Sequence, residues 1–91
     1  MLYALIAWDK PGALDLRLQN RPDHLAYLKD SGVVRQAGPF LGTDEKPCGS
    51  LIILEVDDMA AAEAWADADP YAKAGLFETV RIAPWNRVLE A

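Results

Sequence analysis

Residues 50–71 read SLIILEVDDMAAAEAWADADPY and predict a strand followed by two helices. The run 50–56 is short and almost continuously apolar, which is typical of a buried strand. The two aspartates that follow it commonly open a helix, and the alanine-rich run 59–68 predicts that helix. The next Asp-Pro pair ends it and can begin a second, short helix over 70–74, which a glycine closes.

The other elements lie on both sides of this stretch. Residues 2–8 predict a buried strand, because they are apolar and the turn sequence Asp-Lys-Pro-Gly follows them. Leucines at helical spacing then predict a helix. Because Pro22 is awkward inside a helix, we expect a short first turn up to about Asn20 and a main helix from there to Ser31. Three further segments complete the prediction: a strand over 33–40, a polar loop over 41–49 and a last strand over 76–85.

The order β-α-β-β-α-β predicts a ferredoxin-like α+β fold, with a four-stranded antiparallel sheet that carries both helices on one face. The chain's own helices cover only that face, so the strands should alternate apolar and polar residues. They do not. Leu51 and Ile53 point away from Ile52 and Leu54, yet all four are apolar. Two apolar faces need two covers, so we expect a homodimer, a dimeric α+β barrel closed by the helix-free sheet faces.

Length, charge and cysteine content narrow the class of protein. The chain has 91 residues, which predicts a single domain over 1–91. Its net charge of -5 argues against nucleic acid as a partner, because phosphate binding requires a basic patch. The single cysteine cannot form an internal disulfide and fits a reducing compartment. The apolar N-terminal run is too short for a membrane span and lacks a basic signal-peptide region. We expect a soluble, cytoplasmic protein without a membrane partner.

Several different short motifs are spread along most of the chain. They are Arg17 with Arg21-Pro22-Asp23-His24-Leu25, then Ala37-Gly38-Pro39, Gly49-Ser50, and Ala66-Asp67-Ala68-Asp69-Pro70-Tyr71. In this order and spacing the chain resembles the YciI-related family. The resemblance implies a ferredoxin-like protomer that forms a dimeric α+β barrel, with a cleft that holds a histidine and an aspartate. The family is similar in architecture to muconolactone isomerases and includes an enzyme type that eliminates chloride from a chlorinated hydroxyhydroquinone.

His24 and Asp69 are the candidate catalytic residues. His24 is the only histidine and the side chain best suited to moving a proton at neutral pH. The sequence alone favours a histidine at the core boundary that a backbone carbonyl satisfies; the family resemblance reverses this and favours the catalytic role. Asp69 can cap the short helix, orient the His24 ring, or do both. Asp67 is the rival carboxylate, and we expect it to face solvent.

Six further residues are candidates for substrate binding, and each has a structural alternative. Arg17, Arg21 and His24 share one helical stripe if the helix is continuous, and such a stripe suits an anionic or phenolate substrate. Alternatively, both arginines form surface ion pairs. The other candidates lie at strand ends and after the Asp-Pro pair: Gly38, Pro39, Ser50 and Tyr71. The alternatives there are a bulge, a turn and, for Tyr71, a place in the core.

No cofactor or metal is expected, because the chain lacks a nucleotide-binding glycine pattern and has one histidine without spaced cysteines. Cys48 lies in a Pro-Gly loop, so a thiol triad with His24 and Asp69 is not expected. Three functions remain open. The first is a cofactor-independent enzyme in which His24, held by Asp69, drives elimination, isomerisation or lactone-type chemistry on a small cyclic or aromatic substrate. The second is a small-ligand-binding dimer without turnover, and the third is an accessory module.

Overall fold

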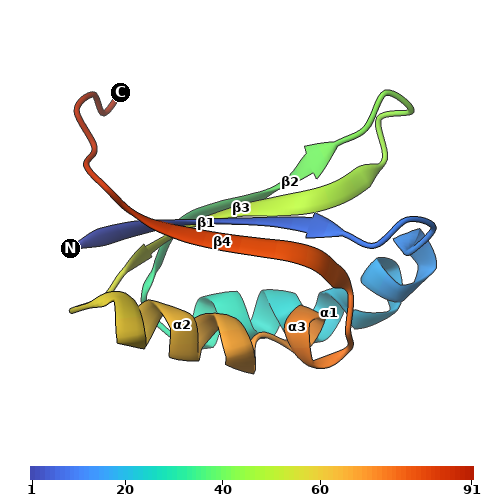
Figure 1. Ribbon diagram of the computed structural model, residues 1–91, viewed down its shortest axis with the longest axis horizontal. Coiled ribbons are helices and arrows are strands. Elements are labelled where there is room, and N and C mark those ends of the chain that lie inside the picture. The colour runs from blue at the N-terminus through green and yellow to red at the C-terminus, as the bar shows by residue number, and fades with distance from the viewer.

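The computed structural model describes residues 1–91, and its elements follow the predicted order (Figure 1). The strands are β1 (Leu2–Asp9), β2 (Val34–Leu41), β3 (Pro47–Glu55) and β4 (Phe77–Trp85). The helices are α1 (Leu14–Asp30), α2 (Met59–Ala68) and α3 (Pro70–Lys73). None of them combines the length and apolar character that crossing a membrane requires.

The four strands form one antiparallel sheet in the order β2-β3-β1-β4. Leu5 in the centre of β1 lies opposite Ile52 of β3 on one side and Ile82 of β4 on the other. Figure 1 shows all three helices against the same face of this sheet, while the other face carries no helix. The predicted ferredoxin-like α+β fold is therefore confirmed.

The core lies between the sheet and the helices. It consists of alternate residues of two central strands and the inner face of α2: Tyr3, Leu5, Ala7, Ile52, Leu54, Ala62 and Trp65. Helix α2 begins as predicted, with the Asp58 carboxylate accepting a hydrogen bond from the Ala61 N–H at 2.8 Å. This cap satisfies an N–H that would otherwise lack a partner and fixes where the helix starts.

The expected interruption of the first helix near Asn20 is wrong, because α1 runs unbroken from Leu14 to Asp30 with Pro22 inside it. Proline removes one backbone hydrogen bond from a helix. Two buried polar side chains fix the two halves of α1: Arg17, before Pro22, binds Asp9 of β1, and His24, after it, binds Asp69 at the break between α2 and α3. These tertiary contacts outweigh the local cost of the proline.

The loop between β2 and β3 is shorter than the predicted 41–49. Leu41 still pairs with Pro47, so both strands extend into the expected loop. The connecting turn closes with a hydrogen bond from the Gly42 N–H to the Lys46 carbonyl, and Glu45 adopts a positive φ of 64° there. The hairpin thus brings Pro47 to the edge of the functional site described below.

The helix-free face of the sheet is largely apolar. It carries alternate residues of β1 together with their neighbours across the sheet. The apolar ones are Leu2, Ala4, Ile6, Trp8, Phe40, Leu51, Ile53, Ala83 and Trp85, and the polar ones are Gln36, Glu55, Thr79 and Arg81. Its large exposed apolar side chains are Trp8 at 45%, Leu51 at 37% and Trp85 at 39%. We call this surface the open sheet face.

Candidate functional site

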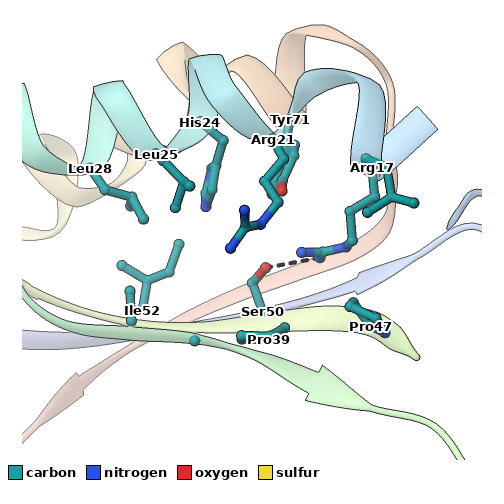
Figure 2. A pocket seen from close by; sticks show the side chains of 13 residues that line it. Arg17, Arg21, His24, Leu25, Leu28, Pro39, Pro47, Ser50, Ile52 and Tyr71 are labelled. Atoms are coloured by element: carbon teal, nitrogen blue, oxygen red, sulfur yellow. Dashed lines mark hydrogen bonds between the residues drawn. The ribbon is translucent and has the colours of Figure 1, made fainter. Parts of the chain in front are cut away.

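A cavity of about 220 Å³ lies between helix α1 and the strands β2 and β3, near one end of the sheet (Figure 2). Its wall combines basic side chains, apolar side chains and the single imidazole of the chain. The lining residues are Arg17, Leu18, Arg21, His24, Leu25, Leu28, Ala37, Gly38, Pro39, Pro47, Ser50, Ile52 and Tyr71. Seven of the eight residues predicted for the site line this cavity, and the eighth, Asp69, lies directly behind the histidine.

His24 and Asp69 are in direct contact. The imidazole Nδ1 lies 2.7 Å from Asp69 Oδ1, and the two residues are only 6% and 1% exposed. A carboxylate can only accept a hydrogen bond, so Nδ1 carries the proton and its N–H donates a hydrogen bond to Asp69. Nε2 of the neutral ring is then unprotonated. Figure 2 shows the free edge of the His24 ring pointing toward the sheet, into the cavity.

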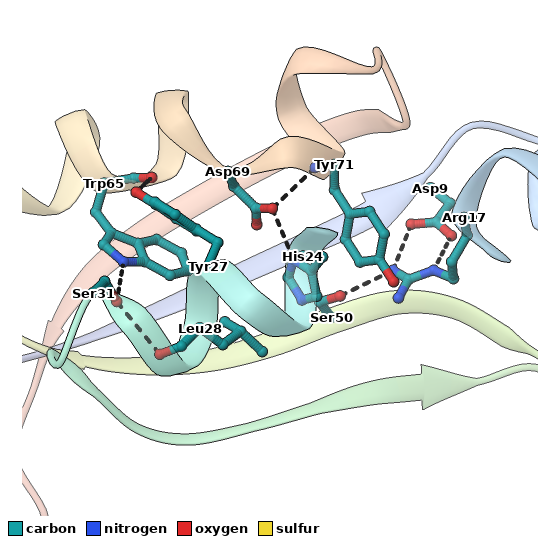
Figure 3. A network of polar contacts seen from close by, with 10 residues as sticks. All are labelled: Asp9, Arg17, His24, Tyr27, Leu28, Ser31, Ser50, Trp65, Asp69 and Tyr71. Atoms are coloured by element: carbon teal, nitrogen blue, oxygen red, sulfur yellow. Dashed lines mark hydrogen bonds and ion pairs between the residues drawn. The ribbon is translucent and has the colours of Figure 1, made fainter. Parts of the chain in front are cut away.

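Asp69 is both a helix cap and a partner of His24, the two roles that the sequence left open. Its Oδ1 accepts a hydrogen bond from the backbone N–H of Tyr71 at 2.9 Å and so caps α3 (Figure 3). The break between α2 and α3 falls at this residue, whose backbone is extended at φ -60° and ψ 129°. This local break turns the carboxylate inward, toward α1. Asp67, the rival carboxylate, is exposed as expected.

Tyr71 is buried, and its ring stacks on the ring of His24 with centroids 3.8 Å apart. Burial raises the pKa of Tyr71 above its ordinary value of 10.0, and the nearby charges of Arg17 and Arg21 offset only part of this effect. The phenol is therefore neutral at physiological pH. Tyr71 contributes a rigid apolar surface to the cavity as well as support for the imidazole.

The two arginines of the predicted stripe have different surroundings. Arg17 is 4% exposed, and its Nε and Nη2 donate to both carboxylate oxygens of Asp9 at 2.7 and 2.9 Å. Burial alone would lower the pKa of Arg17, but the hydrogen bonds and charge of Asp9 outweigh it and raise the pKa. Arg21 lines the cavity one turn further along α1 and forms no ion pair or hydrogen bond with the protein. Figure 2 shows its guanidinium extending toward Ser50.

Gly38, Pro39 and Ser50 form the floor of the cavity, on the two strands under α1. Pro39 of β2 lies opposite Ser50 of β3 in the sheet, so both present side chains on the helix-covered face. Ser50 is buried, and its Oγ accepts a hydrogen bond from Arg17 Nη2 at 2.9 Å. Gly38 lies next to Pro39 and contributes only backbone to the cavity, because the side-chain position of Gly38, opposite Leu51, lies on the helix-free face.

Sequence reasoning missed Asp9, which it treated only as part of the turn after β1. Asp9 follows Leu5 and Ala7 in the alternation of β1, so its side chain lies on the helix-covered face and its carboxylate meets Arg17 of α1. That alternation was the signal that could have identified it. The apolar residues of the cavity were also missed. Leu18, Leu25 and Leu28 share the stripe of Arg21, and their helical spacing was the signal that could have identified them.

Comparisons with known proteins found both relatives in sequence and similar solved structures. A family model described as the YCII-related domain matches residues 1–86. Protein YciI of Escherichia coli O6:H1 (strain CFT073) is 42% identical, over 97% of this chain and 99% of that protein. An uncharacterized protein of Haemophilus influenzae is 36% identical over the same shares of the two chains.

Solved structures show the same fold. The 5-chloro-2-hydroxyhydroquinone dehydrochlorinase of Burkholderia phenoliruptrix, in complex with 2,5-dihydroxybenzoquinone, is similar with a TM-score of 0.88 and 33% identity over 94% of each chain. Rv0793 from Mycobacterium tuberculosis has a TM-score of 0.64 at 12% identity, over 98% of this chain and 100% of that one, and shares the fold alone. On the match to the family model and the identity to protein YciI, this chain belongs to the YCII-related family, as its motifs predicted.

Proposed function

We propose that this protein is a small-molecule enzyme that transfers a proton without a cofactor, with His24 as general acid and base and Asp69 as its orienting partner. The observation that carries the proposal is the 2.7 Å contact between His24 Nδ1 and Asp69 Oδ1 in the wall of an apolar cavity. The unprotonated Nε2 can take a proton from a substrate in the cavity. Asp69 then stabilises the imidazolium ion that results, because its charge lies against the opposite edge of the ring.

The cavity suits a small ring compound with an ionisable oxygen. Leucine side chains on one wall and Ile52 on the floor match an apolar ring, and Tyr71 adds an aromatic surface. Arg21 supplies a positive charge that no acidic side chain neutralises, so an anionic or phenolate oxygen would bind beside it. Gly38, Pro39, Ser50 and Arg17 would complete the binding surface.

The similar dehydrochlorinase supports this class of reaction. Dehydrochlorination removes one proton and one chloride ion, and the chloride leaves with the electron pair of its bond to carbon. The reaction therefore needs a base in contact with the substrate, and His24 is the side chain of the cavity that can act as one near neutral pH. Isomerisation and lactone-type reactions need the same proton transfer and remain within the proposal.

We also propose that two copies pair through the open sheet face. Its support is the row of exposed apolar side chains that no helix covers, among them Trp8 and Leu51. A monomer would leave this surface in water, which is unfavourable in proportion to its apolar area.

The test is chloride release from 5-chloro-2-hydroxyhydroquinone, with binding of 2,5-dihydroxybenzoquinone measured in parallel. We expect His24→Gln to lower turnover by about 10²- to 10⁴-fold while the quinone still binds. Asp67→Asn is the matched control, because it changes an exposed carboxylate two residues from Asp69 and should leave turnover unchanged. Binding of the quinone without chloride release or any proton exchange would instead favour the alternative, a ligand-binding dimer without turnover.

A further inference from the structure

Asp9, Arg17 and Ser50 form a buried chain of hydrogen bonds that ends at the cavity (Figure 3). Arg17 binds both oxygens of Asp9, and its Nη2 also reaches Ser50 Oγ at 2.9 Å. The side chains of Arg17 and Asp9 are each 5% exposed, so solvent contributes little to this arrangement. The two-point contact with Asp9 fixes the plane of the guanidinium, and therefore the direction of the hydrogen bond to Ser50.

This chain of contacts determines which way the Ser50 hydroxyl proton points. A guanidinium has only donors, so Ser50 Oγ must be the acceptor in its contact with Arg17. The hydroxyl proton therefore points elsewhere, and the structure gives it no acceptor within the protein. Ser50 is 3% exposed and lines the cavity, so the one direction left for this donor is the space that a ligand would occupy.

We infer that Ser50 donates a hydrogen bond to an oxygen of the substrate, and that Asp9 is a positioning residue that acts through Arg17. This inference rests on the proposed function and adds a requirement for the substrate: an anionic or carbonyl oxygen that accepts from Ser50 while another part of the molecule reaches His24. The positive charge of Arg17 polarises the hydroxyl and strengthens it as a donor.

The two arginines have different roles in this arrangement. The charge of Arg17 is balanced by Asp9, so its contribution is to orient Ser50. Arg21 has no such partner and supplies the net charge that attracts an anion. A substrate oxygen would therefore accept a hydrogen bond from the neutral Ser50 hydroxyl on the cavity floor and lie beside the cation Arg21 on the helix above. Figure 2 shows the Arg21 guanidinium above the Ser50 hydroxyl in this way.

The test compares two probes that differ in one oxygen, 4-nitrophenolate and nitrobenzene, by calorimetric titration at mildly alkaline pH. The wild-type protein should bind the phenolate more tightly. Ser50→Ala should weaken phenolate binding by about tenfold or more, because a hydrogen bond to a charged oxygen is lost. The affinity of Ser50→Ala for nitrobenzene should stay within about twofold of the wild-type value, because nitrobenzene lacks the phenolate oxygen. A disturbed cavity would instead weaken the binding of both probes.

The role of Asp9 is tested by non-additivity. Asp9→Asn should reduce phenolate binding, and adding it to Ser50→Ala should cause little further loss, because both changes act on one hydrogen bond. The paired replacement Asp9→Leu with Arg17→Met removes the ion pair without leaving a buried charge, and it serves as the second variant if Asp9→Asn is poorly folded. Glu55→Gln is the control, since it alters the exposed Arg35–Glu55 pair, whose contact is also 2.7 Å.

Three results would overturn the inference: no preference of the wild-type protein for the phenolate, an equal loss of both probes in Ser50→Ala, or fully additive effects of the Asp9 and Ser50 changes. These outcomes are separate from failure of the proposed function. That failure would appear as an absence of proton transfer, whatever the two probes do.

Discussion

The ring of His24 lies flat against the ring of Tyr71, with 3.8 Å between their centroids and 14° between their planes. The backbone N–H of Tyr71 also donates to Asp69 Oδ1, the oxygen that accepts from His24 Nδ1. One short segment, residues 69–71, therefore holds the imidazole by its edge and by its face. Such support fixes the ring orientation that a general base needs.

Tyr71→Phe should preserve this support, whereas Tyr71→Leu should remove it. The stacked ring is kept in Tyr71→Phe, so we expect the free energy of unfolding to change by only about 1 kcal/mol. Tyr71→Leu loses a buried aromatic ring and should cost about 3 kcal/mol. Denaturant unfolding measures both values. In the NMR spectrum, the ring-current shift of the His24 protons should persist in Tyr71→Phe and disappear in Tyr71→Leu. Equal shifts in the two variants would contradict the stacking role.

Asp69→Asn and Asp69→Ala should separate the geometry of the carboxylate from its charge. Both protein donors meet one oxygen, Oδ1, so an asparagine can place its amide oxygen there and keep both hydrogen bonds. We expect Asp69→Asn to retain the proton on Nδ1 of His24 but to lower turnover, because the imidazolium loses its countercharge. Asp69→Ala should lose the Nδ1 preference and the α3 cap, at a cost of about 1 kcal/mol.

The measurement is a proton–nitrogen correlation spectrum of the single imidazole, which distinguishes Nδ1–H from Nε2–H. The control is Asp67→Asn, which should leave the spectrum as in the wild-type protein because Asp67 is exposed. A wild-type spectrum with the proton on Nε2 would show that Asp69 does not select the tautomer.

The sequence predicted the fold well because hydrophobic pattern and turn residues agree along most of the chain. The apolar run 51–54 of β3 and the Asp58 cap of α2 are local signals that tertiary contacts reinforce. The continuity of α1 through Pro22 could not be predicted, because the contacts that hold both halves of this helix come from elements distant in sequence. Local propensity gives way where buried tertiary partners oppose it.

The site could be predicted only where family motifs marked it. His24 and Asp69 lie 45 residues apart, and the helices' common position on one sheet face allows them to meet. Asp9 belongs to no motif, although its alternation with Leu5 and Ala7 places it on the helix-covered face of β1. The sequence does not show that Arg17 of α1 reaches this carboxylate, because the contact joins two different elements. The sequence does not show that Arg17 and Arg21 have unequal roles, because the difference comes from a carboxylate partner that only Arg17 has in the structure.

Alkaline pH should destabilise the protein through its buried tyrosines. Burial raises the pKa of both Tyr71 and Tyr27 above the ordinary value of 10.0. In the unfolded chain these phenols ionise near pH 10, whereas the folded protein keeps their protons to higher pH. The folded state binds more protons in that window, so the free energy of unfolding holds below about pH 10 and falls as pH rises through the folded-state pKa values.

Urea unfolding at a series of alkaline pH values measures this effect. The double variant Tyr27→Phe with Tyr71→Phe should lose less stability than the wild-type protein between neutral pH and the alkaline end, because two titrating groups are gone. Comparing the two proteins cancels the titration of lysines. If the wild-type protein and the double variant lost the same stability over this pH range, burial would hold neither phenol neutral.

Gly49→Ala should destabilise the fold. A Cβ at Gly49 would lie 2.6 Å from the Ala7 carbonyl oxygen and 2.9 Å from Trp8 Cε3. The rings of Trp8 and Phe40 stack across this glycine at 4.5 Å, and the Ala7 backbone cannot move without disturbing β1. We expect a loss of about 1–3 kcal/mol in the free energy of unfolding, from overpacking. Gly38→Ala is the control within the sheet, because its added Cβ meets no atom within 4 Å. A loss no larger than the control's would contradict the crowding.

Leu51→Glu should convert the proposed dimer into a monomer. Leu51 lies near the centre of the open sheet face, between Ile6 of β1 and Gly38 of β2, and is 37% exposed in the single chain. A glutamate there would keep its hydration only if nothing packs against it, since burying an unpaired charge between two sheets is strongly unfavourable. Light scattering of the wild-type protein should therefore give twice the 10.0 kDa of the chain, and Leu51→Glu should give the mass of one chain.

Val80→Glu is the matched control for this prediction, because Val80 is similarly exposed at 44% but lies opposite Ala7, on the helix-covered side of β4. The same charge on that side should leave the mass at two chains.

Gly38 and Pro39 also line both the cavity and a shallow hollow on the open sheet face, so β2 is a wall only one strand thick between them. Pairing of two copies would brace that wall, and Leu51→Glu should therefore also weaken ligand binding in the cavity. A wild-type protein with the mass of one chain at micromolar concentration, or two charge variants that dissociate it equally, would rule out pairing through the open sheet face.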